Sequence, residues 1–314
     1  MISIALATYN GKKYIEKQLL SIVNQSVVPD EIVITDDCST DDTIDFINEF
    51  KDKYNSIKWK VVVNNTQLGF AKNFIKSISL TEGDFIFLSD QDDIWERNKI
   101  HEMIKKIKSN DKIDILFSSY RCIDGNDNII DFQYKINNSI YLTILTKIFD
   151  VNKYTYKSFI KSMNIAGMSM CIKKRVIKSF LKLDINTIKY HDLFLSLFAS
   201  IKDGLYFYNK VLTNYRLHND NVIGLKSAVG IKEDRISWLT YNINNQVLIK
   251  DFLLNNRIDN KYIKQLIEII EFNNNRISIM ENKRLLNAIL NIIKICLFPS
   301  LLSYFGDIAY IMKG

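Results

Sequence analysis

Short β-branched apolar runs alternate with longer amphipathic runs through the first 120 residues, and this alternation limits the possible folds most. Short apolar runs rich in β-branched residues predict strands, whereas apolar residues recurring about every 3.6 positions predict helices. Alternating strands and helices are typical of βαβ units on a mostly parallel sheet. We therefore expect an α/β fold, with strands at 2–7, 31–35, 59–63, 85–89 and 113–118 and helices at 13–25, after Ser39, and at 70–79.

The pattern loosens after Ile130. From about Gly230 onward the chain is expected to be helical. The simplest partition is an α/β domain over residues 1–224 followed by a helical C-terminal extension over 225–314. Within this partition we expect strands at 165–172 and 205–208, helices at 174–183 and 192–200, and helix breaks near Asn255, Asn260 and Asn273.

Composition excludes several classes of protein. The chain is 47% hydrophobic and 25% charged, which is the mixture of a soluble globular protein rather than a disordered one. Ten Gly and two Pro in 314 residues argue against collagen-like and linker-like chains. The four Cys have no C-x-x-C spacing, which suggests neither a disulfide framework nor a zinc site.

The net charge of +7 is unevenly distributed. Residues 1–110 carry 14 basic and 17 acidic side chains, 111–225 carry 16 and 10, and 226–314 carry 12 and 8. The longest basic run is Lys173–Arg175, and no nucleic-acid motif accompanies it, so we expect no nucleic-acid partner. The diffuse positive charge fits an anionic small molecule or an anionic membrane surface better.

Targeting signals are not evident in the sequence. Met1 leads directly into strand-like sequence, and no uncharged apolar run reaches the roughly 18 residues that a spanning helix needs. We therefore expect a cytoplasmic protein.

Polar motifs follow three predicted strands, where parallel α/β sheets bind their ligands. Thr8-Tyr9-Asn10-Gly11 follows the first strand, and Asp36-Asp37 follows the second. These side chains can hold a base or a ribose. The structural alternative for the first motif is a plain Asn-Gly turn. The alternative for the second is helix capping by Ser39 and Asp41, with Asp36 and Asp37 merely solvated.

The third motif, Ser89-Asp90-Gln91-Asp92-Asp93-Ile94-Trp95, follows a strongly apolar strand. Three carboxylates within four residues repel one another, so such a cluster is typical of a cation site. Oxygen ligands favour Mg²⁺ or Mn²⁺. A cation held there can bridge a diphosphate and offset the charge that grows on the leaving group.

In order and spacing, Ala7–Gly11, Asp36–Asp41, Gly69–Asn73 and Ser89–Trp95 resemble the family 2 inverting glycosyltransferases of GT-A fold. In particular, they resemble the rhamnosyltransferase-like branch that builds bacterial surface polysaccharides such as capsule or O-antigen. The resemblance extends from Met1 to about Gly224. It implies a GT-A catalytic domain with a nucleotide and metal half over 1–120 and an acceptor half over 121–224.

The resemblance also implies roles for single residues. Thr8, Tyr9 and Asn10 would contact the nucleotide, Asp37 would read the base, and Asp90 would face the ribose. Asn73 is expected at the border of the same pocket. Asp92 would bind a divalent cation, and His218 is expected near the metal or the diphosphate because related enzymes place a His after the last core strand.

The general base of the family falls on Asp192 in Tyr190-His191-Asp192-Leu193. His191 replaces the usual Glu of the family's Glu-Asp pair, although a His-Asp pair is itself usual in the rhamnosyltransferase-like members. A base is required in any case, because an acceptor hydroxyl is a poor nucleophile. The structural alternative for Asp192 is a carboxylate stabilising its helix dipole. Residues expected to line the sugar or acceptor pocket are Gly167, Met168, His191 and Arg216.

We thus expect transfer of a sugar from a nucleoside-diphosphate sugar to a hydroxyl of a bacterial surface glycan or lipid-linked oligosaccharide. The donor would be dTDP-rhamnose or a UDP-hexose, because Asp37 can bond the N3–H of thymine or of uracil. A non-catalytic or degenerate sugar- or nucleotide-binding module is the alternative. A nucleotidyltransferase and a dinucleotide dehydrogenase are disfavoured, because neither a Gly-rich phosphate loop nor G-x-G-x-x-G follows the first strand.

Residues 289–305 form the most apolar stretch, interrupted by Lys294 and Pro299. Two interpretations remain open. The helices could pack on the catalytic domain or on another copy as a homodimer, or they could contact the inner face of the cytoplasmic membrane peripherally.

Overall fold

The computed structural model describes residues 1–130, 150–163, 165–186, 188–218 and 235–313, and packing divides the chain into two compact units. The first unit spans Met1–Tyr134 and Ile165–Arg216, and the second spans Lys135–Asn164 and Leu217–Gly314. The expected domain boundary at residue 224 and the expected helical start near Gly230 lie outside the described residues. Packing separates the units after Arg216 and groups the described residues 150–163 with the second unit, and the expected partition stays a prediction.

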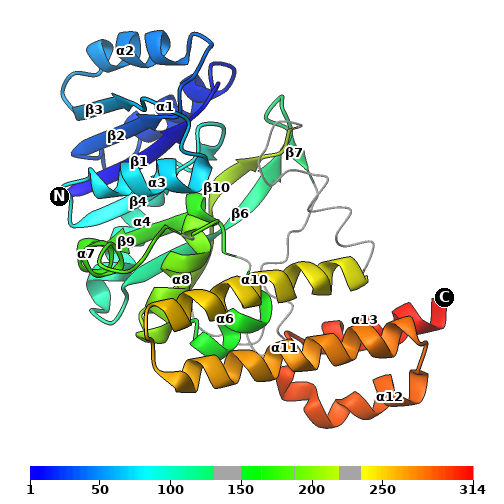
Figure 1. The fold of residues 1–314 in the computed structure, drawn as a ribbon. Helices are drawn as coiled ribbons and strands as arrows, with labels where there is room; N and C mark the ends of the chain where they lie inside the picture. The colour runs from blue at the N-terminus through cyan, green and yellow to red at the C-terminus, as the bar shows by residue number, and fades with distance from the viewer. Residues whose placement is uncertain (131–149, 164, 187, 219–234, 314) are drawn as a thin grey trace. The chain divides into compact units, whose positions relative to one another are not determined.

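The first unit is built on a mixed sheet with the strand order β3-β2-β1-β4-β9-β6-β10-β5 (Figure 1). Parallel pairs join β1 to β2 and β4, β2 to β3, and β6 to β10, whereas β9 runs antiparallel to β4 and β6. The strands are β1 Ile2–Thr8, β2 Glu31–Asp36, β3 Lys58–Val63, β4 Phe85–Ser89, β5 Ile94–Trp95, β6 Ile115–Ile123, β7 Ile129–Ile130, β9 Met170–Lys173 and β10 Leu205–Arg216.

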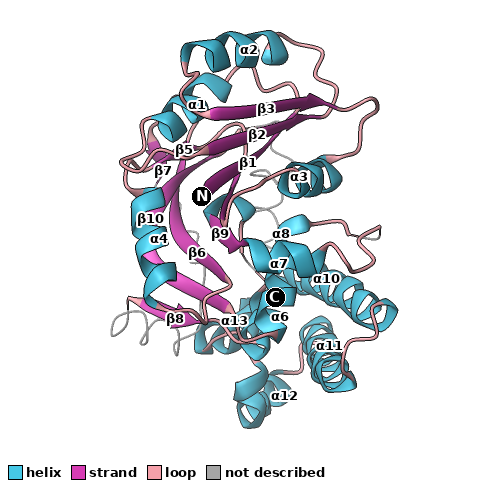
Figure 2. Ribbon diagram, turned by 90° about the vertical axis from the view of Figure 1, so that its left-hand side faces the viewer, coloured by secondary structure: helices cyan, strands magenta, loops and turns pink. Residues whose placement is uncertain are grey.

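Helices cover both faces of this sheet. Figure 2 shows α1 and α4 on one face and α3, α7 and α8 on the other. The central strands are therefore buried on both sides, and they are continuous apolar runs such as Ile4-Ala5-Leu6 and Ile86-Phe87-Leu88, all fully buried. The helices are α1 Ile15–Val23, α2 Thr43–Lys53, α3 Phe70–Ser79, α4 Lys99–Ser109, α7 Lys174–Phe180 and α8 His191–Ile201.

Two predicted strands differ from the observed ones. The strand expected at 165–172 is confined to Met170–Lys173, because Gly167–Ser169 forms a 3₁₀ turn closed by the Ser169 N–H on the Ala166 carbonyl. The strand expected at 205–208 continues to Arg216, because a bulge at Asn209 and Lys210 lets the pairing with β6 resume at Val211.

The second unit is mainly helical. Its helix α6 carries a side-chain N-cap, since Thr155 accepts from the N–H of Ser158. Long helices α10 and α11 form a hairpin, and Asp259 caps α11 through the N–H of Lys261. The elements are β8 Val151–Lys153, α6 Tyr156–Ser162, α10 Arg235–Asn255, α11 Asn260–Glu281, α12 Leu285–Leu290, the 3₁₀ segment η2 Asn291–Leu297, and α13 Leu301–Lys313.

The breaks expected at Asn255 and Asn260 are confirmed as the end of α10 and the start of α11, but the break expected at Asn273 is wrong. Asn273 is buried inside α11, where its amide bonds Gln246 and its Oδ1 accepts from Arg276. Side-chain partners satisfy the polar group, so the helix continues. Within the described ranges, every helix is too short or too polar to cross a lipid bilayer.

Candidate active site

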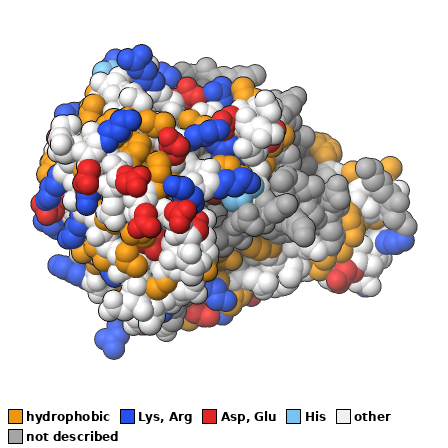
Figure 3. All heavy atoms as spheres, turned by 90° about the horizontal axis from the view of Figure 1, so that it is seen from above, with side chains coloured by type: hydrophobic (Ala, Val, Ile, Leu, Met, Phe, Trp, Pro, Cys, Tyr) orange, Lys and Arg blue, Asp and Glu red, His pale blue; other side chains and the backbone are white. Residues whose placement is uncertain are grey.

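The polar motifs converge at one edge of the sheet. Thr8 at the end of β1 pairs in register with Asp36 at the end of β2, and Leu6 pairs with Ser89 at the end of β4. Because these three strands are parallel, their carboxyl ends, with Asp37 and Asp90 just beyond them, lie together. On the face seen from above, acidic and basic side chains are interspersed (Figure 3).

Asp36 holds the ends of the first two strands together. Its buried carboxylate accepts from Thr8 Oγ1 at 2.7 Å, from the Ser39 N–H at 2.7 Å and from Ser39 Oγ at 2.5 Å. Ser39 therefore does not cap the following helix, as the capping alternative supposed. That helix begins at Thr43 without a side-chain cap on Asp42, and Asp41 accepts from the Thr43 N–H instead.

Asp37 faces the loop that leads into α3. Its carboxylate, buried like that of Asp36, accepts from Asn64 Nδ2 at 2.8 Å and from the N–H groups of Leu68 and Gly69 at 2.7 and 2.8 Å. Oδ2 takes only the Gly69 bond among these, and a carboxylate offers about four acceptor positions. To read a nucleotide base as expected, Asp37 would therefore have to accept the hydrogen bond at a position on Oδ2 that the Gly69 bond leaves open.

Asn73 serves the framework rather than the border of an open pocket. Its Nδ2 donates to the carbonyls of Thr35 at 2.9 Å and Thr8 at 3.3 Å, and its Oδ1 accepts from Asn64 Nδ2 at 2.9 Å. The side chain is buried, and these bonds use most of its capacity. Asn73 can thus act on a nucleotide only through Asn64 and Asp37.

Tyr9 and Asn10 are the exposed members of the first motif, and the Tyr9 side chain is 46% exposed. Asn10 adopts a positive φ of 47°, and its Oδ1 accepts from the Thr40 N–H at 2.8 Å. The backbone of Tyr9 is held by Gln91, whose Oε1 accepts from the Tyr9 N–H and whose Nε2 donates to the Tyr9 carbonyl. Gln91 was not singled out from the sequence.

The acidic motif is strongly coupled electrostatically. Burial, followed by the charges of Asp92 and Asp192, raises the pKa of Asp90 to about 8. Burial, then Asp92 and Asp90, also raises the pKa of Asp93 well above its usual range, and Asp93 Oδ2 has no hydrogen-bond partner in the described part of the chain. Carboxylates gathered with so little compensation favour a bound cation.

Arg216 supports the backbone of this motif through hydrogen bonds. It does not face a pocket, contrary to expectation. Its guanidinium is fully buried, with Nε donating to the Asp92 carbonyl at 2.7 Å and Nη1 to the Asp124 carbonyl at 2.8 Å. Nη1 also pairs with Asp127 at 2.6 Å, and the Arg216 N–H donates to Asp93 Oδ1 at 3.1 Å. Every one of these contacts is with the protein itself, which fixes the backbone that carries Asp92.

Lys99 is a second buried cation that sequence reasoning missed. It begins α4, and its Nζ donates to the Met168 carbonyl at 2.5 Å and to Thr213 Oγ1 at 2.9 Å over the ring of Trp95. Burial lowers the pKa of Lys99 to about 7. Met168, expected in the acceptor pocket, is itself buried in the turn that Lys99 holds.

Asp192 meets the acceptor-side turn. Its Oδ2 accepts from the Gly167 N–H at 3.3 Å, and its Oδ1 accepts from the Leu193 N–H at the start of α8. Its charge contributes to the raised pKa of Asp90, which places the two carboxylates in one electrostatic neighbourhood. Asp192 is thus a carboxylate at the start of α8 that interacts electrostatically with Asp90.

His191 is buried next to this carboxylate. Its ring stacks on Phe74 with centroids 4.1 Å apart, and neither ring nitrogen has a hydrogen-bond partner among the described residues. Burial lowers the pKa of His191, so the imidazole is neutral. Gly167 lies against it, because a Cβ built there would stand 2.9 Å from His191 Nε2.

The donor set suits a hard divalent cation, although its ligands are not all in place. Asp90 and Asp92 offer carboxylate oxygens, and Mg²⁺ is commonly held by one or two carboxylates together with substrate phosphates. No group of three or more His, Cys, Asp or Glu side chains forms a ready ligand cluster within the described ranges. His218 belongs by packing to the second unit, so its proximity to Asp92 stays a prediction.

A model of the family described as glycosyl transferase family 2 matches residues 3–177, more than half of the chain. The chain belongs to this glycosyltransferase family. It is 30% identical over 284 residues to the dTDP-rhamnosyl transferase RfbG of Shigella flexneri, covering 85% of this chain and 92% of that protein. It is 28% identical over 178 residues to the abequosyltransferase RfbV of Salmonella typhimurium, covering 51% and 53%. The predicted rhamnosyltransferase-like resemblance is confirmed.

Solved structures share the fold. S. aureus TarS 1-349 in complex with UDP superposes with a TM-score of 0.58 at 17% identity, covering 84% of this family 2 chain and 69% of the TarS 1-349 chain. The mannosyltransferase PcManGT of Pyrobaculum calidifontis, in complex with GDP-Man and Mn²⁺, gives a TM-score of 0.54 at 13% identity, covering 99% and 84%. The predicted GT-A fold is confirmed.

Proposed function

We propose that this glycosyltransferase is inverting and metal-dependent, and that it moves a sugar from a nucleoside-diphosphate sugar to a hydroxyl of a bacterial surface glycan or lipid-linked oligosaccharide. The observation that carries the proposal is the meeting of Asp192 with the Asp90-Gln91-Asp92 motif at one edge of the sheet. A base beside a cation-binding motif is the arrangement that a single displacement requires.

Each residue of the site has its own role in the proposed reaction. Asp192, held by the Gly167 N–H, would accept the proton of the acceptor hydroxyl as it attacks the anomeric carbon, contributing about 10²–10⁴-fold. Thr8, Tyr9, Asn10 and Asp37 would bind the nucleotide, with Asp90 at the ribose. Asp92 would hold the cation, with His218 as its second ligand, and the bound ion would offset charge on the leaving diphosphate.

The donor is proposed from the relatives. RfbG is named a dTDP-rhamnosyl transferase, and another relative, 24% identical over 180 residues, is the Escherichia coli UDP-Glc:alpha-D-GlcNAc-diphosphoundecaprenol beta-1,3-glucosyltransferase WfgD. These names support dTDP-rhamnose or a UDP-hexose as donor and a lipid diphosphate as acceptor. A lipid-linked acceptor supports a site of action at the inner face of the cytoplasmic membrane.

The test is a panel of nucleotide sugars scored for Mn²⁺-dependent release of nucleoside diphosphate, with the wild type compared with three variants. Asp92→Asn should lose metal-dependent nucleotide binding, whereas Asp192→Asn should keep binding and lose at least about 10²-fold in rate. The exposed Asp111→Asn is the matched control and should behave as wild type. Full activity in both site variants would refute the mechanism. Nucleotide binding without turnover of any donor would favour the non-catalytic module.

A further inference from the structure

The segment that follows α11 in the second unit exposes most of its apolar side chains. In α12 only Ala288 is buried, and in η2 no residue is buried. The outward side chains include Leu286, 68% exposed, and Ile293, 81% exposed. We call this set the α12–η2 patch, and its members are Leu285, Leu286, Ile289, Leu290, Ile292 and Ile293.

The patch does not result from a loosely attached segment. Ala288 packs in a cluster with Ile279 and Met280 of α11, and Phe298 packs against Phe272 and Tyr304. Tyr304 also donates from its hydroxyl to the Ile289 carbonyl at 2.9 Å. Because both ends and the middle of the segment are fixed, the aliphatic side chains between these contacts are held outward.

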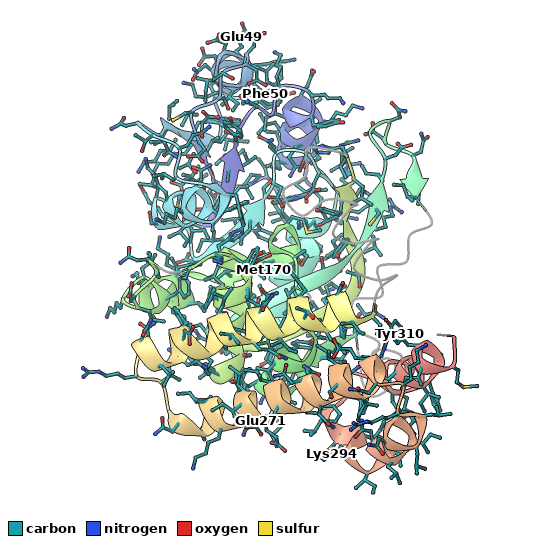
Figure 4. All side chains as sticks on the ribbon, turned by 45° about the vertical axis from the view of Figure 1, so that its right-hand side comes forward. Glu49, Phe50, Met170, Glu271, Lys294 and Tyr310 are labelled. Atoms are coloured by element: carbon teal, nitrogen blue, oxygen red, sulfur yellow. The ribbon has the colours of Figure 1, made fainter. Side chains whose placement is uncertain are left out.

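The position of the patch leaves its outer side uncovered by the described helices. Figures 1 and 2 both show α12 on the side of α11 away from α10. Lys294, within the same segment, lies at the outer edge of the helical unit (Figure 4). A large exposed aliphatic surface with a polar rim marks an interaction site rather than an ordinary surface.

The charges within and just after the patch are positive, and the nearest preceding acid is the exposed Glu281 at the end of α11. From Asn282 to Gly306 the sequence has no Asp or Glu, while Lys283, Arg284 and Lys294 are all exposed. The next acid, Asp307, is buried in ion pairs with Arg235 and Arg276. Cations beside aliphatic side chains are the pattern of a helix lying in the interface of an anionic bilayer.

A second copy of the chain fits this surface less well. A two-fold interface brings the same patch of both copies together, so Arg284 and Lys294 would face a surface that itself carries cations. No acid in the segment would compensate them. An anionic lipid surface meets both the apolar and the cationic parts of the patch.

We infer that the α12–η2 patch docks this glycosyltransferase on the surface of an anionic lipid bilayer, with the aliphatic side chains entering the interface and Arg284 and Lys294 meeting phosphate headgroups. Its use in catalysis rests on the proposed lipid-linked acceptor, whereas the docking itself does not. Docking would restrict the enzyme's search for such an acceptor to the membrane plane.

The experiment is co-sedimentation of the full chain with vesicles of phosphatidylcholine alone and of phosphatidylcholine mixed with phosphatidylglycerol. Wild type should bind the anionic vesicles more tightly. Arg284→Gln with Lys294→Gln should remove that preference, and Leu286→Ser with Ile293→Ser should weaken binding to both vesicles by about tenfold or more. Leu254→Ser is the matched control, since Leu254 is 51% exposed in the last turn of α10. It lies near the start of the 22-residue α11, whereas the patch follows the end of that helix, about 30 Å away.

Wild type that stays in solution with both vesicles would overturn the inference, as would equal binding by all variants. A dimer in sedimentation equilibrium that Leu286→Ser with Ile293→Ser dissociates would overturn it in favour of a second copy. Release of nucleoside diphosphate from the donor is measured on the same samples. Retained release in the patch variants supports the inference by excluding misfolding, and vesicle binding needs no donor, so failure of the proposed transfer reaction would be seen separately.

Discussion

The side-chain amide of Gln91 makes two hydrogen bonds with the backbone of Tyr9, one to its N–H and one to its carbonyl, both 2.9 Å long. The middle residue of the Asp-x-Asp motif thereby fixes the turn after β1. The contact is possible because Gly11 has no side chain, since a Cβ there would lie 2.2 Å from Gln91 Oε1. The nucleotide turn and the acidic motif thus form one rigid assembly.

Gly11→Ala should displace the Gln91 amide and break both bonds to Tyr9. Each such bond contributes about 0.5–1.5 kcal/mol, so we expect a loss of about 1–3 kcal/mol in the free energy of unfolding, with weaker nucleotide binding. Urea titrations of Gly11→Ala, Gln91→Ala and the double variant check this. The double variant should cost less than the sum of the single ones, because truncating the Gln91 side chain leaves room for the new methyl. Strict additivity would argue against the contact.

Arg216→Met should destabilise the protein strongly. It leaves the carbonyls of Asp92 and Asp124 without their guanidinium donor and removes the buried partner of Asp127, a change that typically costs about 3–5 kcal/mol. The control is Arg121→Met, whose guanidinium pairs with Glu96 at the surface and should cost about 1 kcal/mol or less. Thermal unfolding distinguishes them, and similar melting temperatures would contradict the bracing role of Arg216.

Stability should fall as pH rises through the acidic range in the absence of metal. The pKa of Asp90 is raised from 3.8 to about 8 on folding, so between these values the folded chain holds a proton that the unfolded chain has lost. Each such group lowers the free energy of unfolding by up to about 1.4 kcal/mol per pH unit. Urea titrations from about pH 5 to about pH 6, where Lys99 with its pKa of about 7 stays charged, should show the decline.

Two comparisons make this pH test specific. Asp90→Asn should show a shallower decline, and saturating Mn²⁺ should also flatten it in the wild type by favouring the ionised carboxylates. Equal slopes for the wild type and Asp90→Asn would mean that Asp90 is ionised throughout this range.

Gly167→Ala should reduce transfer while leaving nucleotide affinity intact. The new methyl would lie 2.9 Å from His191 Nε2, so the imidazole must shift, while its separation of 3.5 Å from Asp192 Cβ is an ordinary contact. We expect the shift of His191 to displace the adjacent Asp192, the proposed base. A displacement of about 1 Å can cost about 10²-fold in rate. Steady-state kinetics together with nucleotide titration test this, and a decrease in nucleotide affinity with unchanged kcat would place Gly167 on the donor side instead.

The sequence predicted the strands around the nucleotide edge closely, because β1, β2 and β4 are buried on both faces and their apolar runs end at polar motifs. It could not predict the place of β9. This four-residue strand inserts antiparallel between β4 and β6, and its partners lie far away along the chain, from Phe117 opposite Met170 to Phe85 opposite Lys173. Pairing at such separations leaves no periodic trace in the sequence.

The sequence predicted which residues belong to the site better than it predicted which groups those residues contact. Arg216 was expected in the sugar or acceptor pocket and is buried, because a sequence cannot show which backbone carbonyls a guanidinium meets. Lys99 did leave a signal, since it occupies the same apolar stripe of α4 as Met103 and Ile107. A lysine at an apolar helical position would have indicated a buried cation.

The stacking of His191 on Phe74 makes the imidazole an internal reporter. The chain has three His, and His191 lies buried and neutral against an aromatic face. In a proton NMR spectrum its ring signals should be displaced upfield by the Phe74 ring current. Because Asp192 is the next residue, movement of those signals on adding donor or acceptor would report occupancy beside the base without any label.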